Sequence, residues 1–342
     1  MKCLLIILAL GMTAAAQAPP PTFFGMNVNH LDTPFPSPVA YGTLRFWDDS
    51  TTWGLINTNN GVYNWKAIDY WTTSEQSQGV SDGEYVLGGP PIPSFAQGSP
   101  IVGLNSDGTG TNQYWRNWVA AVSQHFVDNN FTISGYEIWN EFQNSWRWPG
   151  TAPQMMRLAE DARCIITGRG SITATAETCQ QVLTTVNRTT PVSPQSKITS
   201  PSYYRGNAQT WAVWQTYYAQ PGAQAAAEIM NFHCYNVDPQ VCIGQIETQE
   251  KSIPNVPFWM TETSWSEVGT NDLTDQQKAD WVTSIYTSLQ GKVDRIYWYA
   301  EDNTLTGLLL NLSNNTPNLA GQAYNNLFGK PAAPTGMSAV VH

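Results

Sequence analysis

The chain has 342 residues and a formal net charge of −10, with 16 Lys and Arg against 26 Asp and Glu. Binding of nucleic acids or anionic membranes depends on cationic side chains, so we expect neither as a partner. Only 12% of the residues are charged, about half the usual share, whereas 15 are Trp. This composition favours an extracellular protein that handles neutral polar ligands.

The first 18 residues have the three parts of a secretory signal peptide. Lys2 precedes an apolar run from Leu4 to Leu10, and small residues follow this run up to Ala18. The run is far too short to span a bilayer, so we expect a secreted protein, extracellular or periplasmic, without a membrane anchor. The predicted divisions are a signal peptide over 1–18, one folded domain over 19–330 and a loosely held tail over 331–342.

Four of the five cysteines remain after the signal peptide, an even number that suits an oxidising compartment. We favour the near-neighbour pairing, Cys164 with Cys179 and Cys234 with Cys242, over the two other pairings; four buried free thiols are the alternative. The sequence has four His, no C-x-x-C spacing and no zincin, P-loop, dinucleotide-binding or nucleophile-elbow signature. We therefore predict neither a metal nor a cofactor.

Strand-like and helix-like segments alternate along the rest of the chain. The clearest helix has one apolar face that begins at Trp115 and ends at Phe126. A capping box of Thr274 and Gln277 opens another helix, which buries Trp281. The expected strands are 23–29, 41–47, 84–87, 136–141, 197–203, 229–235, 257–262 and 295–300, and further helices are expected around 65–71, 155–166, 211–218 and 320–328.

Eight strands that alternate with helices in one domain predict an α/β fold, a single (β/α)8 TIM barrel. A doubly wound open sheet would show the same alternation. We favour the barrel because Glu141 and Glu262 both close predicted strands and no phosphate-binding turn follows the first strand.

These two glutamates close the fourth and seventh strands, and the carboxyl ends of the strands are where an α/β barrel keeps its chemistry. Glu141 and Glu262 would then face one another across the barrel mouth. Two carboxyl groups so placed suit hydrolysis of a glycosidic bond, since one can protonate the leaving oxygen while the other attacks or activates water. Either residue alone could instead be a solvated loop residue or a helix cap. Glu137, deeper on the fourth strand, could compete for the acid role.

The sequence Ile138–Glu141 (IWNE) resembles the strand-four motif of glycoside hydrolase clan A, and Met260–Glu262 (MTE) resembles its strand-seven motif. The resemblance implies a retaining β-glycosidase in which Glu141 is the acid/base, Glu262 is the nucleophile and Asn140 binds the sugar 2-hydroxyl.

Two further segments, Gly88–Pro91 (GGPP) and Gly61–Trp65 (GVYNW), are most similar to glycoside hydrolase family 39 and its relatives. Xylosidases of that family usually append a β-sandwich to the barrel, whereas this chain ends soon after its eighth strand. The resemblance therefore points to the clan more strongly than to this family.

Other residues resemble clan contacts at the same end of the barrel. Arg45 on the second strand is similar to an arginine that supports the nucleophile, and His233 and Tyr235 on the sixth are similar to contacts of that carboxylate. Trp298 on the eighth strand resembles a sugar-stacking tryptophan. In the alternative interpretation, Arg45 pairs with Asp48 and His233 is a satisfied core residue.

Five tryptophans follow strand ends, where the loops of a barrel gather. Indole rings stack on the apolar C–H faces of sugars, so several such rings suggest several subsites, an open cleft and cleavage within a neutral oligosaccharide or polysaccharide. The alternative is that half of them fill the loop core. The five are Trp47, Trp53, Trp146, Trp148 and Trp265, of which we assign Trp47, Trp146 and Trp265 to substrate binding.

Retention of configuration requires carboxyl groups about 5–5.5 Å apart, and inversion requires about 6.5–9.5 Å. Clan resemblance implies the shorter distance. We expect burial and a neighbouring negative charge to raise the pKa of Glu141, and Arg45 to keep Glu262 ionised. We expect a monomer. The alternatives are a transglycosylase with the same site and a non-catalytic glycan-binding barrel.

Overall fold

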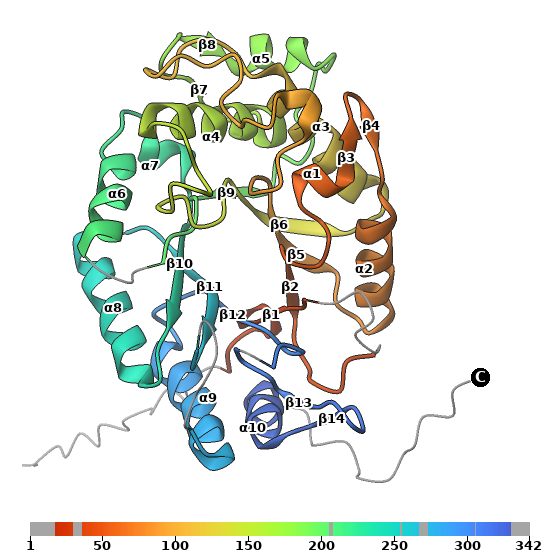
Figure 1. The fold of residues 1–342 in the computed structure, drawn as a ribbon, viewed down its shortest axis with the longest axis vertical. Coiled ribbons are helices and arrows are strands. Elements are labelled where there is room, and N and C mark those ends of the chain that lie inside the picture. The colour runs from red at the N-terminus through yellow and green to blue at the C-terminus, as the bar shows by residue number, and fades with distance from the viewer. Residues whose placement is uncertain are drawn as a thin grey trace, which may run out of the picture.

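The computed structural model describes residues 18–29, 36–204, 208–253, 255–266, 273–304 and 306–329. Eight parallel strands form a barrel surrounded by helices (Figure 1), in the order β10-β11-β12-β1-β2-β5-β6-β9. Parallel bridges from Thr199 to Ile229 and from Tyr204 to His233 join the two ends of this order. The predicted (β/α)8 barrel is therefore confirmed, and the open sheet is excluded. Nearly all of the predicted signal peptide and all of the tail lie outside the described residues.

All eight expected strands are present, with different bounds. The fourth strand ends at Glu137, so Glu141 lies four residues beyond it and not at its last position. The barrel strands are β1 (Phe24–Asn27), β2 (Thr43–Phe46), β5 (Asp82–Val86), β6 (Thr132–Glu137), β9 (Lys197–Thr199), β10 (Met230–Tyr235), β11 (Phe258–Ser264) and β12 (Arg295–Trp298).

The expected helices are also present, and the capping box of Thr274 and Gln277 is confirmed. One long helix, α8 (Pro239–Ser252), was not predicted from the sequence, because its few buried apolar residues give a weak helical period. The other long helices are α2 (Lys66–Ser77), α3 (Gln113–Asp128), α4 (Ala152–Thr167), α6 (Ala208–Tyr218), α9 (Asp275–Leu289) and α10 (Leu319–Phe328). The short elements are η1 (Pro21–Phe23), α1 (Trp53–Ile56), β3 (Asn57–Asn59), β4 (Val62–Tyr63), η2 (Ser94–Ala96), β7 (Ser171–Ile172), β8 (Glu177–Thr178), α5 (Cys179–Thr185), α7 (Ala223–Ala226), β13 (Leu310–Asn311) and β14 (Thr316–Pro317).

Two aromatic rings fill the barrel interior below its polar layer. Trp259 and Tyr297 pack together with their ring centroids 6.2 Å apart. Glycines on β1 and β6 make room for them: a Cβ on Gly25 would lie 2.4 Å from the Tyr297 ring, and one on Gly135 would lie 2.4 Å from the Trp259 ring. The rings thus form a floor beneath the polar layer, and Arg295 packs against the other side of this floor, 4.2 Å from the centroid of the Trp259 ring.

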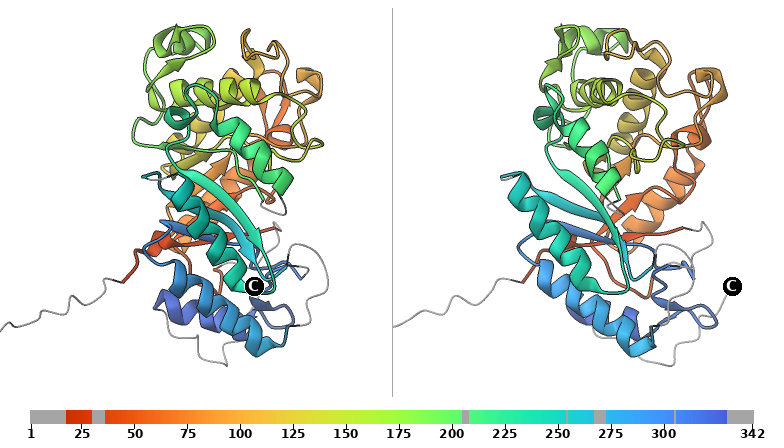
Figure 2. Two further views of the ribbon diagram at one scale, coloured as in Figure 1. Left: turned by 90° about the vertical axis from the view of Figure 1, so that its left-hand side faces the viewer. Right: turned by 60° about the vertical axis from the view of Figure 1, so that its left-hand side comes forward.

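The segment formed by β7, β8 and α5 lies beyond α4, at the top of Figure 1 and of both views in Figure 2. The Cys164–Cys179 disulfide ties it to α4. Arg116 on α3 adds ion pairs to Asp161 at 2.8 Å and to Glu177 at 2.7 Å. The second disulfide, Cys234–Cys242, joins β10 to α8, so both predicted pairings are confirmed.

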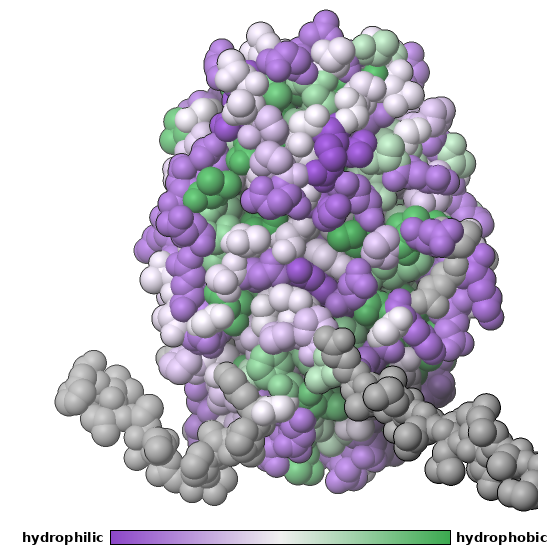
Figure 3. Space-filling model, turned by 180° about the vertical axis from the view of Figure 1, so that it is seen from behind, coloured by the Kyte–Doolittle hydropathy of each residue, from purple (hydrophilic) through white to green (hydrophobic). Residues whose placement is uncertain are grey.

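Polar and apolar residues are interspersed over the surface seen from behind (Figure 3), as is ordinary for a face in contact with water. Among the described residues, no helix combines the length and the hydropathy needed to cross a bilayer.

Replacing both Cys164 and Cys179 by alanine should lower the free energy of unfolding by about 3 kcal/mol, the value for a loop of about 15 residues. This disulfide, with a sequence separation of 15, lies on the outer side of α4, away from the barrel interior. Activity at 25 °C should therefore remain unchanged. Urea unfolding followed by tryptophan fluorescence measures the loss, and an unchanged free energy of unfolding would contradict this role.

Candidate active site

Glu141 lies in the loop after β6 with a positive φ of 47°. This conformation costs a non-glycine residue about 1–3 kcal/mol and persists only where the surroundings enforce it. Here the Glu141 amide donates to Ser202 Oγ at 3.0 Å, and the Ser202 amide donates to the Trp139 carbonyl at 2.9 Å. On the other side, the Asn140 amide donates to the Gly88 carbonyl at 3.1 Å. The loops after β5 and β9 thus fix Glu141 from both sides.

Glu262 points into the barrel because of a β-bulge in β11. Phe232 on β10 lies opposite Met260, and the next residue, His233, lies opposite Glu262, so Thr261 is an extra residue. A bulge of this kind re-aims the side chains that follow it. Strict alternation from inward-facing Trp259 would have turned Glu262 outward.

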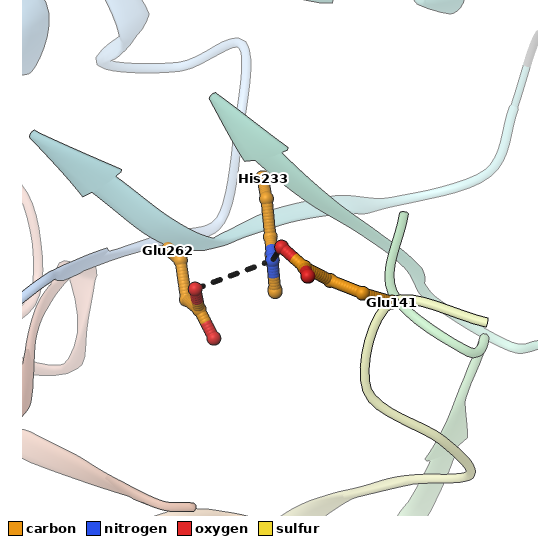
Figure 4. A group of neighbouring side chains, drawn as sticks. All are labelled: Glu141, His233 and Glu262. Carbon is orange, nitrogen blue, oxygen red and sulfur yellow. Dashed lines mark hydrogen bonds and ion pairs between the residues drawn. The ribbon is translucent and has the colours of Figure 1, made fainter. Parts of the chain in front are cut away.

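The bulge and the β6 loop bring three side chains together, as Figure 4 shows. The His233 ring lies between the two carboxyl groups, with Nδ1 3.1 Å from Glu141 Oε1 and 3.3 Å from Glu262 Oε2. One carboxyl oxygen of each glutamate and one His233 nitrogen all lie within 4.8 Å of one another. Burial lowers the pKa of His233 to about 3, against the opposing effect of Glu262. The imidazole is therefore neutral at physiological pH.

Both oxygens of Glu262 accept strong hydrogen bonds. Arg45 Nη1 donates to Oε1 at 2.6 Å, and the Tyr235 hydroxyl donates to Oε2 at 2.5 Å. Arg45 also donates to Glu137 at 2.9 Å and to Asn140 Oδ1 at 2.8 Å. Arg45 therefore lies beside this carboxyl group, as the clan resemblance implies.

Two more glutamates lie beneath Arg45 and are fully buried. Glu137 holds the guanidinium from below, and Glu84 accepts from Asn231 at 2.7 Å and from Thr199 at 3.1 Å. Burial raises the pKa of both carboxyl groups, although Arg45 opposes it. Glu137 is thus enclosed in the layer under the site, so it is not available to protonate a substrate.

Burial also raises the pKa of Glu141, which agrees with our expectation. The charges near it differ from the expectation, since Arg147 and Arg45 both act to lower this pKa. Arg147 Nη2 lies 3.3 Å from Glu141 Oε2. The candidate acid therefore has a cationic neighbour that the sequence analysis did not identify.

Of the five loop tryptophans, only Trp146 is exposed, with 69% of its surface accessible. Trp47 packs on Gly89, Trp53 lies against Trp115, and Trp148 lies against Trp139. Four of the five rings therefore fill the loop core, and their interpretation as exposed stacking surfaces is wrong.

Trp265 and Trp298 are buried outside the barrel, with their ring centroids 5.1 Å apart, and both meet Trp281 of α9. The Trp298 indole nitrogen donates to the Gly307 carbonyl at 2.5 Å. Neither ring is free to stack on a sugar, so their assignment to substrate binding is corrected.

The residue that reaches the site is instead Tyr299, the first residue after β12. Its ring meets that of Tyr235 edge-on with centroids 5.9 Å apart, and its hydroxyl donates to Asp48 and accepts from Asn29. The signal that could have found it is strand alternation, because Tyr299 has the parity of inward-facing Tyr297 and Trp298 does not. Asp48 is thereby engaged by Tyr299, and Arg45 is engaged by Glu262.

Glu141, His233 and Glu262 could also offer one ligand atom each to a metal ion. Both oxygens of Glu262 already accept from Arg45 or Tyr235, and Arg147 adds a second positive charge beside Glu141. The protein's own groups therefore already bind both oxygens of Glu262.

Residues 168–324 match the family model described as the glycosyl hydrolase catalytic core. This matched region, a little under half of the chain, is similar to a glycosyl hydrolase catalytic core. This core includes β9 to β12, and with them His233, Tyr235 and Glu262. A comparison of the whole sequence with curated proteins gives no match.

Solved structures with a similar fold include several glycosidases. A glucosidase from Croceicoccus marinus is 13% identical, with a TM-score of 0.61 over 90% of this chain and 67% of that one. A GH39 β-xylosidase from Caulobacter crescentus is 14% identical, with a TM-score of 0.58 over 92% and 73%. A fungal β-1,4-galactanase is 12% identical, with a TM-score of 0.58 over 83% and 87%. The shared barrel and the family match over residues 168–324 together bear out the resemblance of this chain to clan A.

Tyr235→Phe should lower kcat by about 10-fold to 100-fold, the value of one hydrogen bond to a charged group. The change removes only the hydroxyl that donates to Glu262. Tyr85→Phe is the matched control, because Tyr85 is buried outside the barrel and donates to the Thr51 carbonyl at 2.5 Å. The control should lose stability and keep kcat. Equal kcat losses in the two variants would contradict a specific role for Tyr235.

Proposed function

We propose that this glycosyl hydrolase is a secreted, retaining β-glycosidase in which Glu262 is the nucleophile and Glu141 is the acid/base. The observation that carries the proposal is the close approach of the two carboxyl groups, with an oxygen of each within 4.8 Å of the other and of His233. This spacing favours a covalent intermediate, because an inverting enzyme needs about 6.5–9.5 Å to admit a water molecule between its carboxyl groups.

In the first step, Glu141 gives its proton to the glycosidic oxygen while a Glu262 oxygen bonds to the anomeric carbon and the leaving group departs. In the second step, the ionised Glu141 takes a proton from water, and the resulting oxygen displaces Glu262. Arg45 and Tyr235 hold the nucleophile in place throughout. His233, uncharged between the two glutamates, can donate a hydrogen bond without competing for the proton.

Asn140 is placed to bind the sugar beside the nucleophile. Its side-chain oxygen accepts from Arg45 at 2.8 Å, which leaves the amide nitrogen to donate to a substrate hydroxyl. A hydrogen bond to the 2-hydroxyl strengthens as the ring becomes oxocarbenium-like, so it stabilises the transition state more than the bound substrate.

The proposed substrate is a neutral oligosaccharide or polysaccharide, cleaved internally. The low charge content and the exposed Trp146 ring support this class, since such a ring offers a stacking surface at one end of a bound glycan. The secretory signal in the sequence and the two disulfides support export. The monomeric state remains our expectation.

A screen against defined β-linked glucans, xylans, mannans and galactans, with chromatography of the products, tests the proposal. Accumulation of short oligosaccharides from one polymer is the expected result. Release of single sugars alone would exclude internal cleavage, and intact polymers throughout would favour a glycan-binding barrel. Products longer than the starting oligosaccharide would indicate a transglycosylase.

A further inference from the structure

Arg147 is held at a fixed place relative to Glu141 by the loop that carries both residues. The Asn144 amide donates to the Glu141 carbonyl at 3.1 Å, and the Arg147 amide donates to the Asn144 carbonyl at 2.8 Å. The Trp139 indole nitrogen donates to the Arg147 carbonyl at 3.2 Å. Two linked turns and a buried ring therefore fix the backbone of Arg147.

The Arg147 side chain is fixed as well. Its guanidinium carbon lies 4.4 Å from the centroid of the Trp146 ring, and Nη2 lies 3.3 Å from Glu141 Oε2. The side chain of Arg147 is 21% exposed and that of Glu141 is 6% exposed. A stacked guanidinium in so enclosed a place is weakly screened by solvent, so it acts strongly on the carboxyl group beside it.

The other charged and titratable groups around Glu141 come from three strands. Neutral His233 and the Tyr235 hydroxyl come from β10, Glu262 comes from β11, and Arg45 comes from β2. Arg45 is engaged by Glu262 and Glu137. Among the described residues, Arg147 is thus the cation in direct contact with Glu141.

We propose that Arg147 is a positioning residue that acts through Glu141, stabilising the carboxylate that forms when the proton passes to the leaving group. The inference rests on the proposed function, because it assigns a partner to the proposed acid/base. Nothing in the strand-four resemblance includes Arg147, which lies six residues beyond Glu141.

The movement of charge in the first step explains how Arg147 acts through Glu141. Glu141 begins as a neutral acid, and its proton moves to the glycosidic oxygen as the bond to the anomeric carbon breaks and the bond to Glu262 forms. Negative charge therefore grows on Glu141 during this step, at 3.3 Å from Arg147 Nη2. The attraction is greater in the transition state than in the bound substrate, which is the condition for catalysis.

The same attraction makes Glu141 a stronger acid, so Arg147 moderates the effect of burial on its pKa. The first step needs protonated Glu141, and activity falls as pH rises through that pKa. Removal of the Arg147 charge raises the pKa, and the fall in activity should therefore move to higher pH.

The experiment measures kcat/KM against pH for the wild type and for Arg147→Gln, with an aryl glycoside of poor leaving-group ability. In the variant, the alkaline limb of the kcat/KM profile should move to higher pH by about one unit. A nearby opposite charge shifts the pKa of a carboxyl group by about 1–3 units, and the expected shift is the smallest of these. The plateau should fall about tenfold, because a weaker acid protonates the leaving group less readily.

Arg188→Gln is the control for loss of one positive charge. Arg188 lies in the segment between α5 and β9, where it donates to the Thr190 carbonyl at 3.2 Å, and its profile should match the wild type. Arg147→Met keeps the aliphatic stem and serves if the glutamine variant does not fold; the same shift is expected.

An alkaline limb that stays in place in a folded, active Arg147 variant would overturn the proposal, as would an equal shift in Arg188→Gln. Either result leaves hydrolysis by the wild type intact and so counts against the role of Arg147 alone. A wild type that hydrolyses no β-glycoside would instead refute the proposed function.

Discussion

Glu262→Gln is expected to lower kcat by at least about 10⁴-fold on every substrate, because the covalent bond to the anomeric carbon cannot form without the carboxylate. The change preserves the shape of the side chain beside Arg45 and Tyr235, so the fold should be retained. Pre-steady-state kinetics on an activated aryl glycoside measures the effect. The wild type should show a burst of the aryl alcohol where hydrolysis of the intermediate is the slow step, and the variant should show none.

Glu75→Gln is the matched control for this substitution. Glu75 is also a fully buried glutamate, but it lies on α2 and accepts from the Tyr41 hydroxyl at 2.8 Å. Its replacement should leave kcat unchanged. Retention of more than a tenth of the wild-type kcat by Glu262→Gln would contradict the assignment of the nucleophile.

Glu141→Ala is expected to lose about 10³-fold in kcat/KM on substrates with a poor leaving group, within the range for loss of general acid catalysis. A good leaving group departs without protonation, so the variant should still carry out the first step on substrates that have one. The second step should then be slow, because no base activates water. Added azide needs no base and should restore turnover, giving a glycosyl azide of β configuration.

The configuration of the azide product distinguishes the role of Glu141 from that of Glu262. Azide added to a Glu262 variant would attack the glycoside directly, so any azide product should have the α configuration. Equal losses on good and poor leaving groups in Glu141→Ala, without rescue by azide, would contradict its role as acid/base.

The sequence was sufficient to predict the barrel and to select both glutamates. The eight predicted runs of β-forming residues are strands in the structure. Their outward side chains, such as Met26, Leu44 and Ile296, pack against the helices. Glu141 and Glu262 were recognised from their short motifs. The two disulfides followed from the near-neighbour spacing of the cysteines.

The direction of individual side chains could be predicted from alternation only where a strand is regular, and it could not be predicted at a bulge or in a loop. The bulge at Thr261 reverses the alternation of β11 and turns Glu262 inward. On β12 the alternation continues unbroken, so Tyr299 reaches the site while Trp298 packs outside. A tryptophan next to a strand end looks the same in sequence whether it faces a loop core or solvent.

The arrangement of charged side chains around the two carboxyl groups also could not be predicted from the sequence. Arg45 is shared by Glu262, Glu137 and Asn140, which come from two other strands and the loop after β6. Arg147 meets Glu141 only because the intervening loop turns back on itself. One cation thus lies beside each carboxyl group, Arg45 beside Glu262 and Arg147 beside Glu141. In the proposed reaction, Arg147 favours the charged form that Glu141 acquires.

The most direct test of the account is the configuration of the first sugar released, followed by proton NMR before mutarotation. Two carboxyl groups at the observed approach predict double displacement, so a β-linked substrate should first give the β-anomer. Initial appearance of the α-anomer would mean single displacement by water and would contradict the assignment of Glu262 as a nucleophile.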